Sequence, residues 1–300
     1  MANVIALAKK YTRLVDEKYQ KESLTNDLTS PASLAREGAN AKEILYRQVG
    51  VSGLGDYSRN SGYTNNSVTV EWKTATFNYD RGTKITLDTQ DNEETMGDTY
   101  LIAQNALQTY QVAPEGDAFT FATIASKTGI SVANESGESY ANGEEFLAAL
   151  LKGVTKMDED QVPAENRILY ATPTLLNSVM ALDTSKSREV LGKFAKTVAV
   201  PQTRFYTKID LLDGKTSSEE MGGFKKDTTG KDINFMIIHK PAVIKFDKHV
   251  VSDAIPPELN ADADAYISKY RKYGLVDVFN NKTAGIYISY KAAKGGLRWE

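Results

Sequence analysis

Histidine and cysteine, the residue types that most often bind metals or act as nucleophiles or bases, are scarce in this sequence. The chain has two histidines, His239 and His249, and no cysteine. A zinc-binding histidine pair on one helix is spaced by four residues, whereas these two lie ten apart in a strand-like stretch. Without cysteine, disulfides, thiolate nucleophiles and cysteine zinc sites are excluded. The sequence therefore predicts no metal site and no cofactor, and both histidines are interpreted as ordinary strand or loop residues.

The other motifs with chemical potential are incomplete. Asp213-Gly214-Lys215-Thr216 ends like a phosphate-binding loop, but the glycine needed five positions earlier is Ile209. No Gly-x-Ser-x-Gly elbow marks a nucleophilic serine. Adjacent carboxylates such as Glu219-Glu220 are typical of solvated surfaces rather than of a catalytic cleft. We therefore predict a turn at Asp213-Gly214, no catalytic residues, and a function that depends on shape and contacts.

Composition places the chain among globular proteins and excludes several partners. Its 300 residues are 41% hydrophobic and 25% charged, which is enough to build a sizeable core. The net charge is −3, whereas a protein that grips DNA by its phosphates is normally basic. No apolar run approaches the ~18 residues of a membrane span, so no membrane partner is expected.

The first element to position is an amphipathic helix over residues 2–21. Val4, Leu7, Tyr11 and Leu14 recur at spacings of three and four, and charged residues occupy the other face. A polar stretch that contains Pro31 follows. Two interpretations stay open: an arm that reaches a partner, or a helix that packs on its own domain.

A long hairpin is predicted next. Residues 43–51 can be extended, residues 68–77 alternate between two faces as a clear strand, and a Gly-, Ser- and Asn-rich stretch over 52–67 separates them. Tyr79 continues the second strand, and Asp80-Arg81-Gly82 is read as a turn into another strand over 83–89. A two-stranded hairpin with few large apolar residues is marginal alone. We therefore expect it to lie against another subunit.

The rest of the chain alternates helices and strands. Residues 95–112 predict a long helix that Pro114 ends or kinks, with a second helical piece over 117–127. A compact α/β unit follows, and an apolar strand over 234–246 bends at Pro241. The α/β unit comprises a helix over 142–156, a buried strand over 167–171 and a helix over 174–182 that starts after Pro173. At the C-terminus, 266–279 and 285–290 are read as a hairpin, although the tyrosines over 266–273 also fit helical spacing.

Three segments of this chain resemble the major capsid proteins of tailed bacteriophages of the Hong Kong 97 type. They are Gly53-Leu54-Gly55-Asp56-Tyr57-Ser58-Arg59-Asn60, the run from Trp72 through Asp80-Arg81-Gly82 to Asp88, and 262–287. Their shared order, rather than any one motif, carries the resemblance, which covers essentially the whole chain. It implies an α+β fold with an N-terminal arm, an extended β-hairpin loop, a long spine helix, a peripheral sheet and an α/β axial domain.

The resemblance also implies how the chain is divided and what it does. The expected parts are the N-terminal arm (1–42), the extended loop and following strand (43–92), the spine helix and first peripheral part (93–140), the axial domain (141–245) and the second peripheral part (246–300). Copies would form the pentamers and hexamers of an icosahedral shell around double-stranded DNA, bound without sequence specificity. A scaffolding protein and a portal are the further expected partners. The expected location is the virion, with assembly in the host cytoplasm.

Six residues are the candidates for contacts between subunits. They lie on the extended loop and the strand that follows it: Tyr57, Arg59, Trp72, Phe77, Tyr79 and Arg81. Two alternatives compete with a phage capsid subunit. One is a bacterial nanocompartment shell of the same fold that holds an enzyme cargo. The other is a monomeric α/β ligand-binding or enzymatic protein, which would need a deep pocket with converging polar groups.

Overall fold

The computed structural model describes residues 23–31, 36–37, 43–60, 62–90, 104–182 and 184–292. The helix predicted over 2–21 and most of the one predicted over 95–112 lie outside these residues. The strands are β1 (Arg36–Glu37), β2 (Glu43–Val51), β3 (Val68–Thr76), β4 (Tyr79–Asp88), β5 (Ser131–Val132), β6 (Arg167–Ala171), β7 (Lys196–Ala199), β8 (Ile209–Leu211), β9 (Phe224–Lys226), β10 (Ile233–His239), β11 (Val243–Ile255), β12 (Ala265–Val278) and β13 (Ile286–Tyr290).

The helices are fewer and mostly follow one another in the middle of the chain. They are the π-helix η3 (Gln108–Val112), α4 (Ala113–Ala125), α5 (Gly143–Glu159), α6 (Pro173–Met180) and α7 (Ser185–Leu191). Five short 3₁₀ turns complete the described structure: η1 (Asn26–Leu28), η4 (Gln202–Arg204), η5 (Lys240–Ala242), η6 (Pro257–Leu259) and η7 (Asn280–Gly285).

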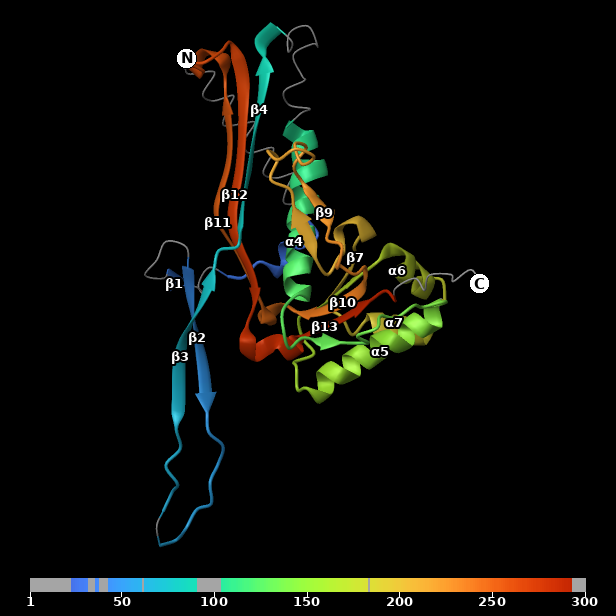
Figure 1. Cartoon of the computed structure of the whole chain (residues 1–300). Helices are drawn as coiled ribbons and strands as arrows, with labels where there is room; N and C mark the ends of the chain where they lie inside the picture. Colours follow the sequence, from blue (N-terminus) through green and yellow to red (C-terminus); the bar gives the residue numbers. More distant parts are fainter. Residues whose placement is uncertain are drawn as a thin grey trace, which may run out of the picture.

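A five-stranded sheet of order β5-β13-β10-β6-β7 forms the compact part of the molecule (Figure 1). Side chains of a strand alternate between the two faces of its sheet. On one face, Ile168 and Tyr170 of β6 belong to a core shared with Phe121 of α4. On the other, Leu169 joins a core with Phe146 of α5. This double burial explains why all residues of β6 and β10 are buried, as the continuous apolar run of β6 predicts.

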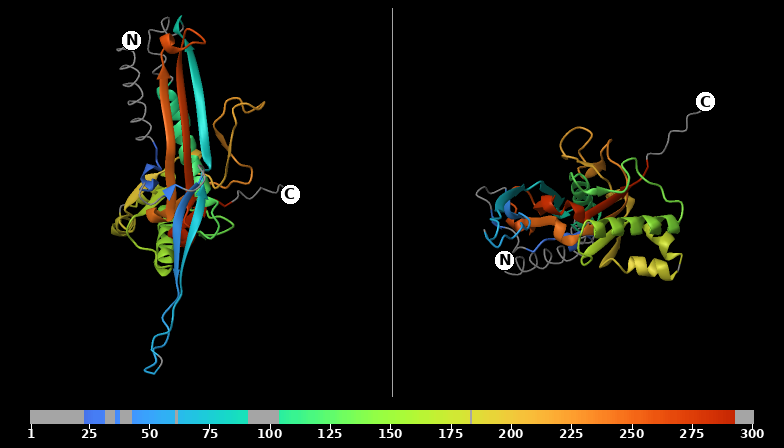
Figure 2. Two further views of the ribbon diagram at one scale, coloured as in Figure 1. Left: turned by 90° about the vertical axis from the view of Figure 1, so that its left-hand side faces the viewer. Right: turned by 90° about the horizontal axis from the view of Figure 1, so that it is seen from below.

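A second, elongated sheet of order β11-β12-β4 runs away from the compact part, and α4 lies alongside it (Figures 1 and 2). The strand predicted over 234–246 is therefore two strands in two sheets. The bend predicted at Pro241 is confirmed, because η5 separates β10 from β11.

The predicted C-terminal hairpin is wrong. β12 pairs with β11 and β4, whereas β13 pairs with β10 and β5. The turn η7 carries the chain from one sheet to the other. Residues 266–273 form a strand, so the helical alternative for them is also wrong.

The turn predicted at Asp80-Arg81-Gly82 is wrong, and Tyr79 does not belong to the strand before it. Tyr79 begins β4, and all three turn residues pair with β12, with Gly82 opposite Arg271. A Cβ on Gly82 would lie 2.9 Å from the carbonyl oxygen of Tyr270. Glycine stands here because two backbones approach closely, which is a known use of glycine within strands.

Asn78 joins β3 to β4 where the chain passes from one sheet to the next. Its Nδ2 donates to the carbonyl of Val276 at 2.8 Å, and its Oδ1 accepts from the Val276 N–H at 3.1 Å. The side chain of Asn78 thus makes the two hydrogen bonds to Val276 that a neighbouring strand would otherwise make. Only Phe77 and Asn78 lie between the end of β3 and the start of β4.

Pro114 does not end the long helix. The backbone is helical from Gln104 to Ala125, with Pro114 in the first turn of α4. The five residues of η3 just before it are wound as a π-helix. Proline removes the N–H bond to the residue four before it and its ring crowds that carbonyl. The wider π turn accommodates the ring, so the predicted continuation through 117–127 is confirmed up to Ala125.

Candidate functional site

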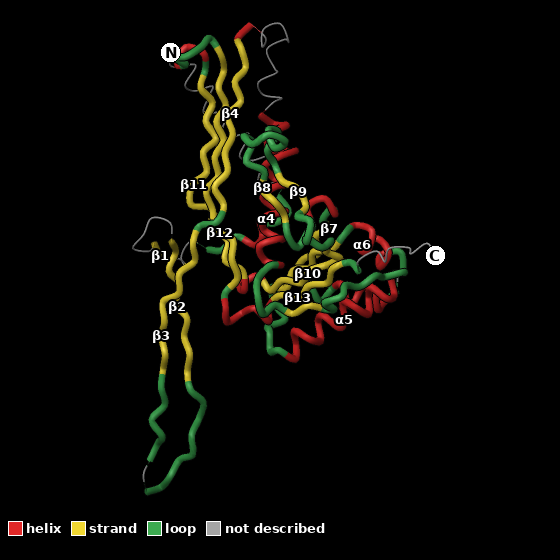
Figure 3. Tube along the Cα trace, in the orientation of Figure 1, coloured by secondary structure: helices red, strands yellow, loops and turns green. Residues whose placement is uncertain are grey.

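The hairpin of β2 and β3 projects from the rest of the molecule (Figure 3). Its strands pair from Glu43 opposite Thr76 to Val51 opposite Val68, so both predicted strands are confirmed. Only its base is buried, where Ile44, Tyr46 and Ala75 join a small core with β11 and β12. Eight of the thirteen exposed large hydrophobic side chains in the described residues lie on it: Val49, Val51, Leu54, Tyr57, Tyr63, Val68, Val70 and Trp72.

Three of the predicted contact residues stand on the projecting part of the hairpin. Trp72 is 50% exposed, and the guanidinium of Arg47 lies 5.7 Å from its ring centroid. Tyr57 packs against Tyr63 at a centroid distance of 4.9 Å in the distal loop. Arg59 is exposed in the same loop. These side chains offer aromatic and cationic surface to a partner.

The other three predicted contact residues lie against the body of the chain. Phe77 stacks on Tyr273 at 4.8 Å. Tyr79 is buried, and its hydroxyl donates to Glu115 Oε1 at 3.0 Å. Arg81 Nε donates to the same oxygen at 2.7 Å, and its Nη2 donates to the Gly223 carbonyl at 3.1 Å. Tyr79 and Arg81 therefore fix β4 to α4 within one chain, which holds the strand that follows the hairpin.

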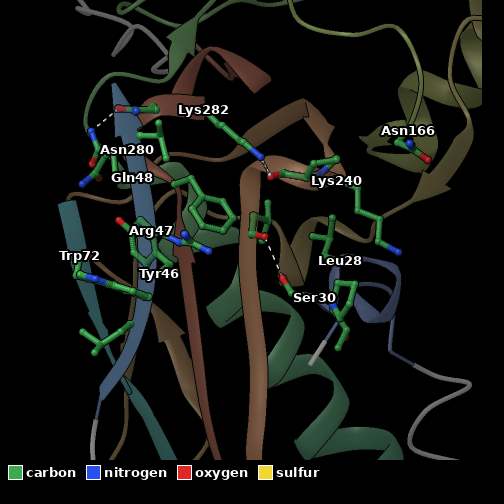
Figure 4. Close-up of a pocket in the computed structure, with 18 residues that line it drawn as sticks. Leu28, Ser30, Tyr46, Arg47, Gln48, Trp72, Asn166, Lys240, Asn280 and Lys282 are labelled. Atoms are coloured by element: carbon green, nitrogen blue, oxygen red, sulfur yellow. Dashed lines mark hydrogen bonds between the residues drawn. The ribbon is translucent and has the colours of Figure 1, made fainter. Parts of the chain in front are cut away.

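A groove of about 880 Å³ lies between the base of the hairpin and the compact part (Figure 4). Tyr46, Arg47 and Gln48 of β2 line one side, together with Trp72 of β3. Residues 28–31, η5 and η7 line the other side. Tyr46 meets Phe279 edge to face at 5.0 Å, and Gln48 Nε2 donates to Asn281 Oδ1 at 2.7 Å. These two contacts connect β2 with Phe279 and Asn281, and we call the groove the hairpin groove.

The hairpin groove is cationic. Arg47, Lys240 and Lys282 line it, and none of its described lining residues is Asp or Glu. Lys282 Nζ donates to the Pro241 carbonyl at 3.1 Å, which leaves its charge unneutralised. Among the described residues, none of the three cations forms an ion pair; Arg47 and Lys282 are exposed and Lys240 is half-buried. By contrast, the buried Arg167 and Lys272 each have a carboxylate partner.

A buried ionic cluster holds the first described residues onto the fold. Asp117 of α4 is fully buried and accepts hydrogen bonds from Leu24 N at 3.0 Å and from Thr25 Oγ1 at 2.8 Å. Arg204 Nη1 lies 3.3 Å from its carboxylate. Lys245 Nζ of β11 donates to Thr25 Oγ1 at 2.8 Å and to the Thr25 carbonyl at 2.9 Å. Residues 23–25 are thereby fixed to α4 and β11 together.

Burial and the charge of nearby Lys272 lower the pKa of Lys245 to about 8, against a weaker opposing effect of Asp247, Asp117 and Asp27. Lys272 itself pairs with Asp247 at 3.0 Å. Sequence reasoning missed this cluster. The signal that could have found it is Lys245 itself, a single cation in the apolar run around Ile244, because an unpaired lysine is rarely buried.

The other motifs noted in the sequence have ordinary structural roles. The carboxylate of Asp213 accepts a hydrogen bond from the Thr216 hydroxyl, and the N–H groups of Thr216 and Lys215 donate to it at 2.8 Å each; these bonds lower the pKa of Asp213 to about 2. The predicted turn is thus confirmed, within the longer connection between β8 and β9. Where the structure describes the chain, no three His, Asp or Glu side chains gather as metal ligands. No helix in that part has the length and apolar character needed to cross a bilayer.

Comparison with known proteins identifies the architecture. No protein-family model and no curated protein matches the sequence. Solved structures do match. The capsid of cyanophage P-SCSP1u matches with a TM-score of 0.58 and 14% identity, over 90% of this chain and 88% of that one. The mature capsid of bacteriophage PhiM1 matches with a TM-score of 0.58 and 11% identity, over 91% of this chain and 88% of that one. A virus-like particle from Pyrococcus furiosus also matches, with a TM-score of 0.58 and 11% identity, over 94% of this chain and 99% of that one.

The chain has the Hong Kong 97-type capsid fold. The extended β-hairpin loop expected of that fold is the β2–β3 hairpin, and α5, β6 and α6 belong to the compact α/β part around the five-stranded sheet. What the sequence alone missed within the Hong Kong 97-type fold is the hairpin groove. Its cations come from three separate elements, β2, η5 and η7, and no sequence spacing brings these together.

Proposed function

We propose that this chain is the major capsid protein of a tailed bacteriophage. Its copies form the pentamers and hexamers of an icosahedral shell that encloses double-stranded DNA without reading its sequence. It acts as a structural protein of the virion, not as an enzyme, and it assembles in the host cytoplasm with a scaffolding protein and a portal as further partners.

One observation carries this proposal: a projecting hairpin with an apolar surface that its own chain does not cover. Exposed contiguous apolar surface marks interaction sites in soluble proteins. Beyond its base, the hairpin has only its own two strands, and such a ribbon is marginally stable in water. The three capsid and virus-like-particle structures named above, each covering 90% or more of this chain, support the same assignment.

Trp72, Tyr57 and Arg59 are the proposed contacts of the hairpin with a neighbouring copy. Aromatic residues and arginine are enriched in interfaces, and these three are exposed on the projecting part. Phe77, Tyr79 and Arg81 are proposed to take part through the position they give the hairpin. Repeated weak contacts of this kind close into a shell by symmetry.

The test is electron microscopy of the purified full chain after size-exclusion chromatography, together with limited proteolysis of the hairpin. Closed shells or ring-shaped capsomers are expected, with the hairpin cleaved in any free monomer and protected in the shells. A monomer whose hairpin resists protease would contradict the proposal. Shells that co-purify with an enzyme instead of packaging DNA during infection would identify a nanocompartment.

A further inference from the structure

The hairpin groove presents positive charge and apolar surface together. Lys240 and Lys282 come from the compact part and Arg47 from the hairpin, so cations stand on both sides (Figure 4). Pro31, Leu45 and Pro241 supply apolar surface between them. Charged side chains without a counter-charge are unfavourable close together, and an acidic partner would relieve their repulsion. The surface is therefore suited to a segment with several carboxylates and an apolar residue.

The same chain carries such a segment at the turn between β11 and β12, which we call the acidic turn (residues 253–264). Its charged residues are all carboxylates, Asp253, Glu258, Asp262 and Asp264, and all four are exposed. None of them forms an ion pair with a described residue, and the Asp264 carboxylate accepts a hydrogen bond from the Thr89 hydroxyl. Leu259 is 62% exposed at its centre.

The acidic turn is also presented in a defined shape. Pro256 caps the single 3₁₀ turn η6 and Pro257 is its first residue, and Asn260 Nδ2 donates to the Ala265 carbonyl at 3.0 Å. Proline fixes its own φ, so less conformational freedom is lost when the turn binds. Leu259 and Glu258 are adjacent in η6, which places an apolar and an acidic side chain in one short turn.

These two surfaces cannot meet within one molecule. The acidic turn joins β11 and β12 at one end of the β11-β12-β4 sheet (Figure 1). The hairpin groove is lined by residues at the other end of the same two strands, Val243 of β11 and Phe279 just after β12. We propose that the acidic turn of one copy docks into the hairpin groove of a neighbouring copy, with Leu259 against the apolar surface and Glu258 facing Lys240. This inference rests on the proposed function, because it needs more than one copy.

Charge also argues against another segment of this chain as the occupant. Residues 1–22 contain five cations, Lys9, Lys10, Arg13, Lys18 and Lys21, against three carboxylates. A segment with that excess would meet the three groove cations with like charge, which is unfavourable at close range. The acidic turn has the opposite sign and no cation.

The first experiment is a charge exchange read by shell assembly. Lys240→Glu and Glu258→Lys, each alone, should raise the protein concentration needed for shells by about tenfold, because like charges then face each other. The double variant Lys240→Glu with Glu258→Lys should restore assembly. Single variants that assemble like the wild-type chain, or a double variant as impaired as the two losses combined, would overturn the contact.

The second experiment uses the absence of cysteine from the chain. A double variant, Lys240→Cys with Leu259→Cys, is assembled and treated with a short bismaleimide. Covalent dimers and longer ladders are expected, and the control pair Met221→Cys with Leu259→Cys should give few, since Met221 is 96% exposed on the β8–β9 connection. Equal cross-linking of both pairs, or none in intact shells, would refute the docking.

The two proposals fail in different ways. If the wild-type chain forms no shells or capsomers, the proposed function fails, and the contact fails with it. If shells form but the pair at 240 and 259 stays unlinked, only the contact fails. If Lys240→Glu leaves assembly unchanged and lowers the DNA retained by shells, the groove binds nucleic acid and the contact is refuted.

Discussion

At the residue scale, a few buried charges fix the start of the described chain. Asp117 is enclosed by donors from residues 23–25 and by Arg204, and Lys245 reaches the same Thr25 from the opposite side. Buried charges of this kind are costly unless every partner is in place. The cluster therefore acts as a unit that fixes residues 23–25 to α4 and β11.

Replacing Asp117 with Ala should lower the free energy of unfolding by about 3 kcal/mol or more, because the N–H groups of Leu24 and Thr25 lose their acceptor and Arg204 loses its counter-charge. Urea unfolding measures this, and mass spectrometry of protease fragments should locate new cleavage near residues 23–25. The control Glu189→Ala removes an exposed carboxylate of α7 and should leave both readouts unchanged. Similar losses in the two variants would argue against the cluster.

Lys245 should make stability depend on pH at the alkaline end. Its pKa is about 8 in the folded chain and 10.5 when unfolded. Between these values the unfolded chain binds more protons, so stability rises with pH. Relative to Lys245→Met, the wild-type chain should therefore gain stability from pH 8 to 10.5 and show a constant difference below pH 7. Thermal unfolding of both proteins across that range provides the measurement, and a difference that is flat throughout would contradict it.

At the element scale, helix α5 lies close on the sheet because of one small residue. A Cβ on Gly153 would come within 2.9 Å of Ile237 of β10 and of Tyr287 of β13. The helix is otherwise amphipathic and starts at Asn142, whose side chain accepts from Glu145 N. Glycine in mid-helix is unfavourable by propensity, so its presence here reflects close packing.

Gly153→Leu should destabilise the chain by about 1–3 kcal/mol, since the added side chain has no room between α5 and the sheet. The neighbouring Lys152→Leu places the same side chain at an exposed position of the same helix and should have little effect. Urea unfolding of both variants tests this. An unchanged Gly153→Leu protein would mean that helix and sheet separate more easily than their packing indicates.

Local sequence patterns were sufficient to predict individual strands but not to predict which strands pair with each other. The alternation of β3 and the apolar run of β6 predict strands that the structure confirms. The C-terminal hairpin was wrong because nearness in sequence favoured pairing β12 with β13, whereas burial of Ile286 and Ile288 beside β10 decides otherwise. The turn predicted at Asp80-Arg81-Gly82 is wrong because glycine is typical both of tight turns and of strands whose backbones approach closely.

At the scale of the whole molecule, the chain combines a well-packed body with a hairpin that it cannot bury. A monomer with this surface exposes Trp72, Leu54 and Tyr63 to water. Covering such side chains with a partner is favourable in proportion to their apolar area. The stability of the body and the stability of an assembly should therefore respond to different residues.

Trp72→Ala tests that separation. Since the ring is half exposed and contacts Arg47 across the hairpin, its loss should change the unfolding free energy of the monomer by less than about 1 kcal/mol. Shells should form in lower yield and dissociate at lower temperature, as followed by electron microscopy and light scattering. Phe77→Ala, at the partly buried base, should instead destabilise the monomer itself. Equal loss in monomer and shell for Trp72→Ala would count against the interface.

The side chain of Asn78 has a mechanical consequence. It fastens the junction of β3 and β4 to both backbone groups of Val276, so the point where the hairpin leaves the elongated sheet is fixed in place. The direction of the hairpin is held by the small core at its base and by a few contacts beside it, such as the hydrogen bond from Gln48 to Asn281. The junction at Asn78 is thus a fixed point about which the hairpin can change its direction. If copies assemble as proposed, we expect the hairpins to swing about this junction while the strand pairs of the body stay intact, which would let the shell change its curvature.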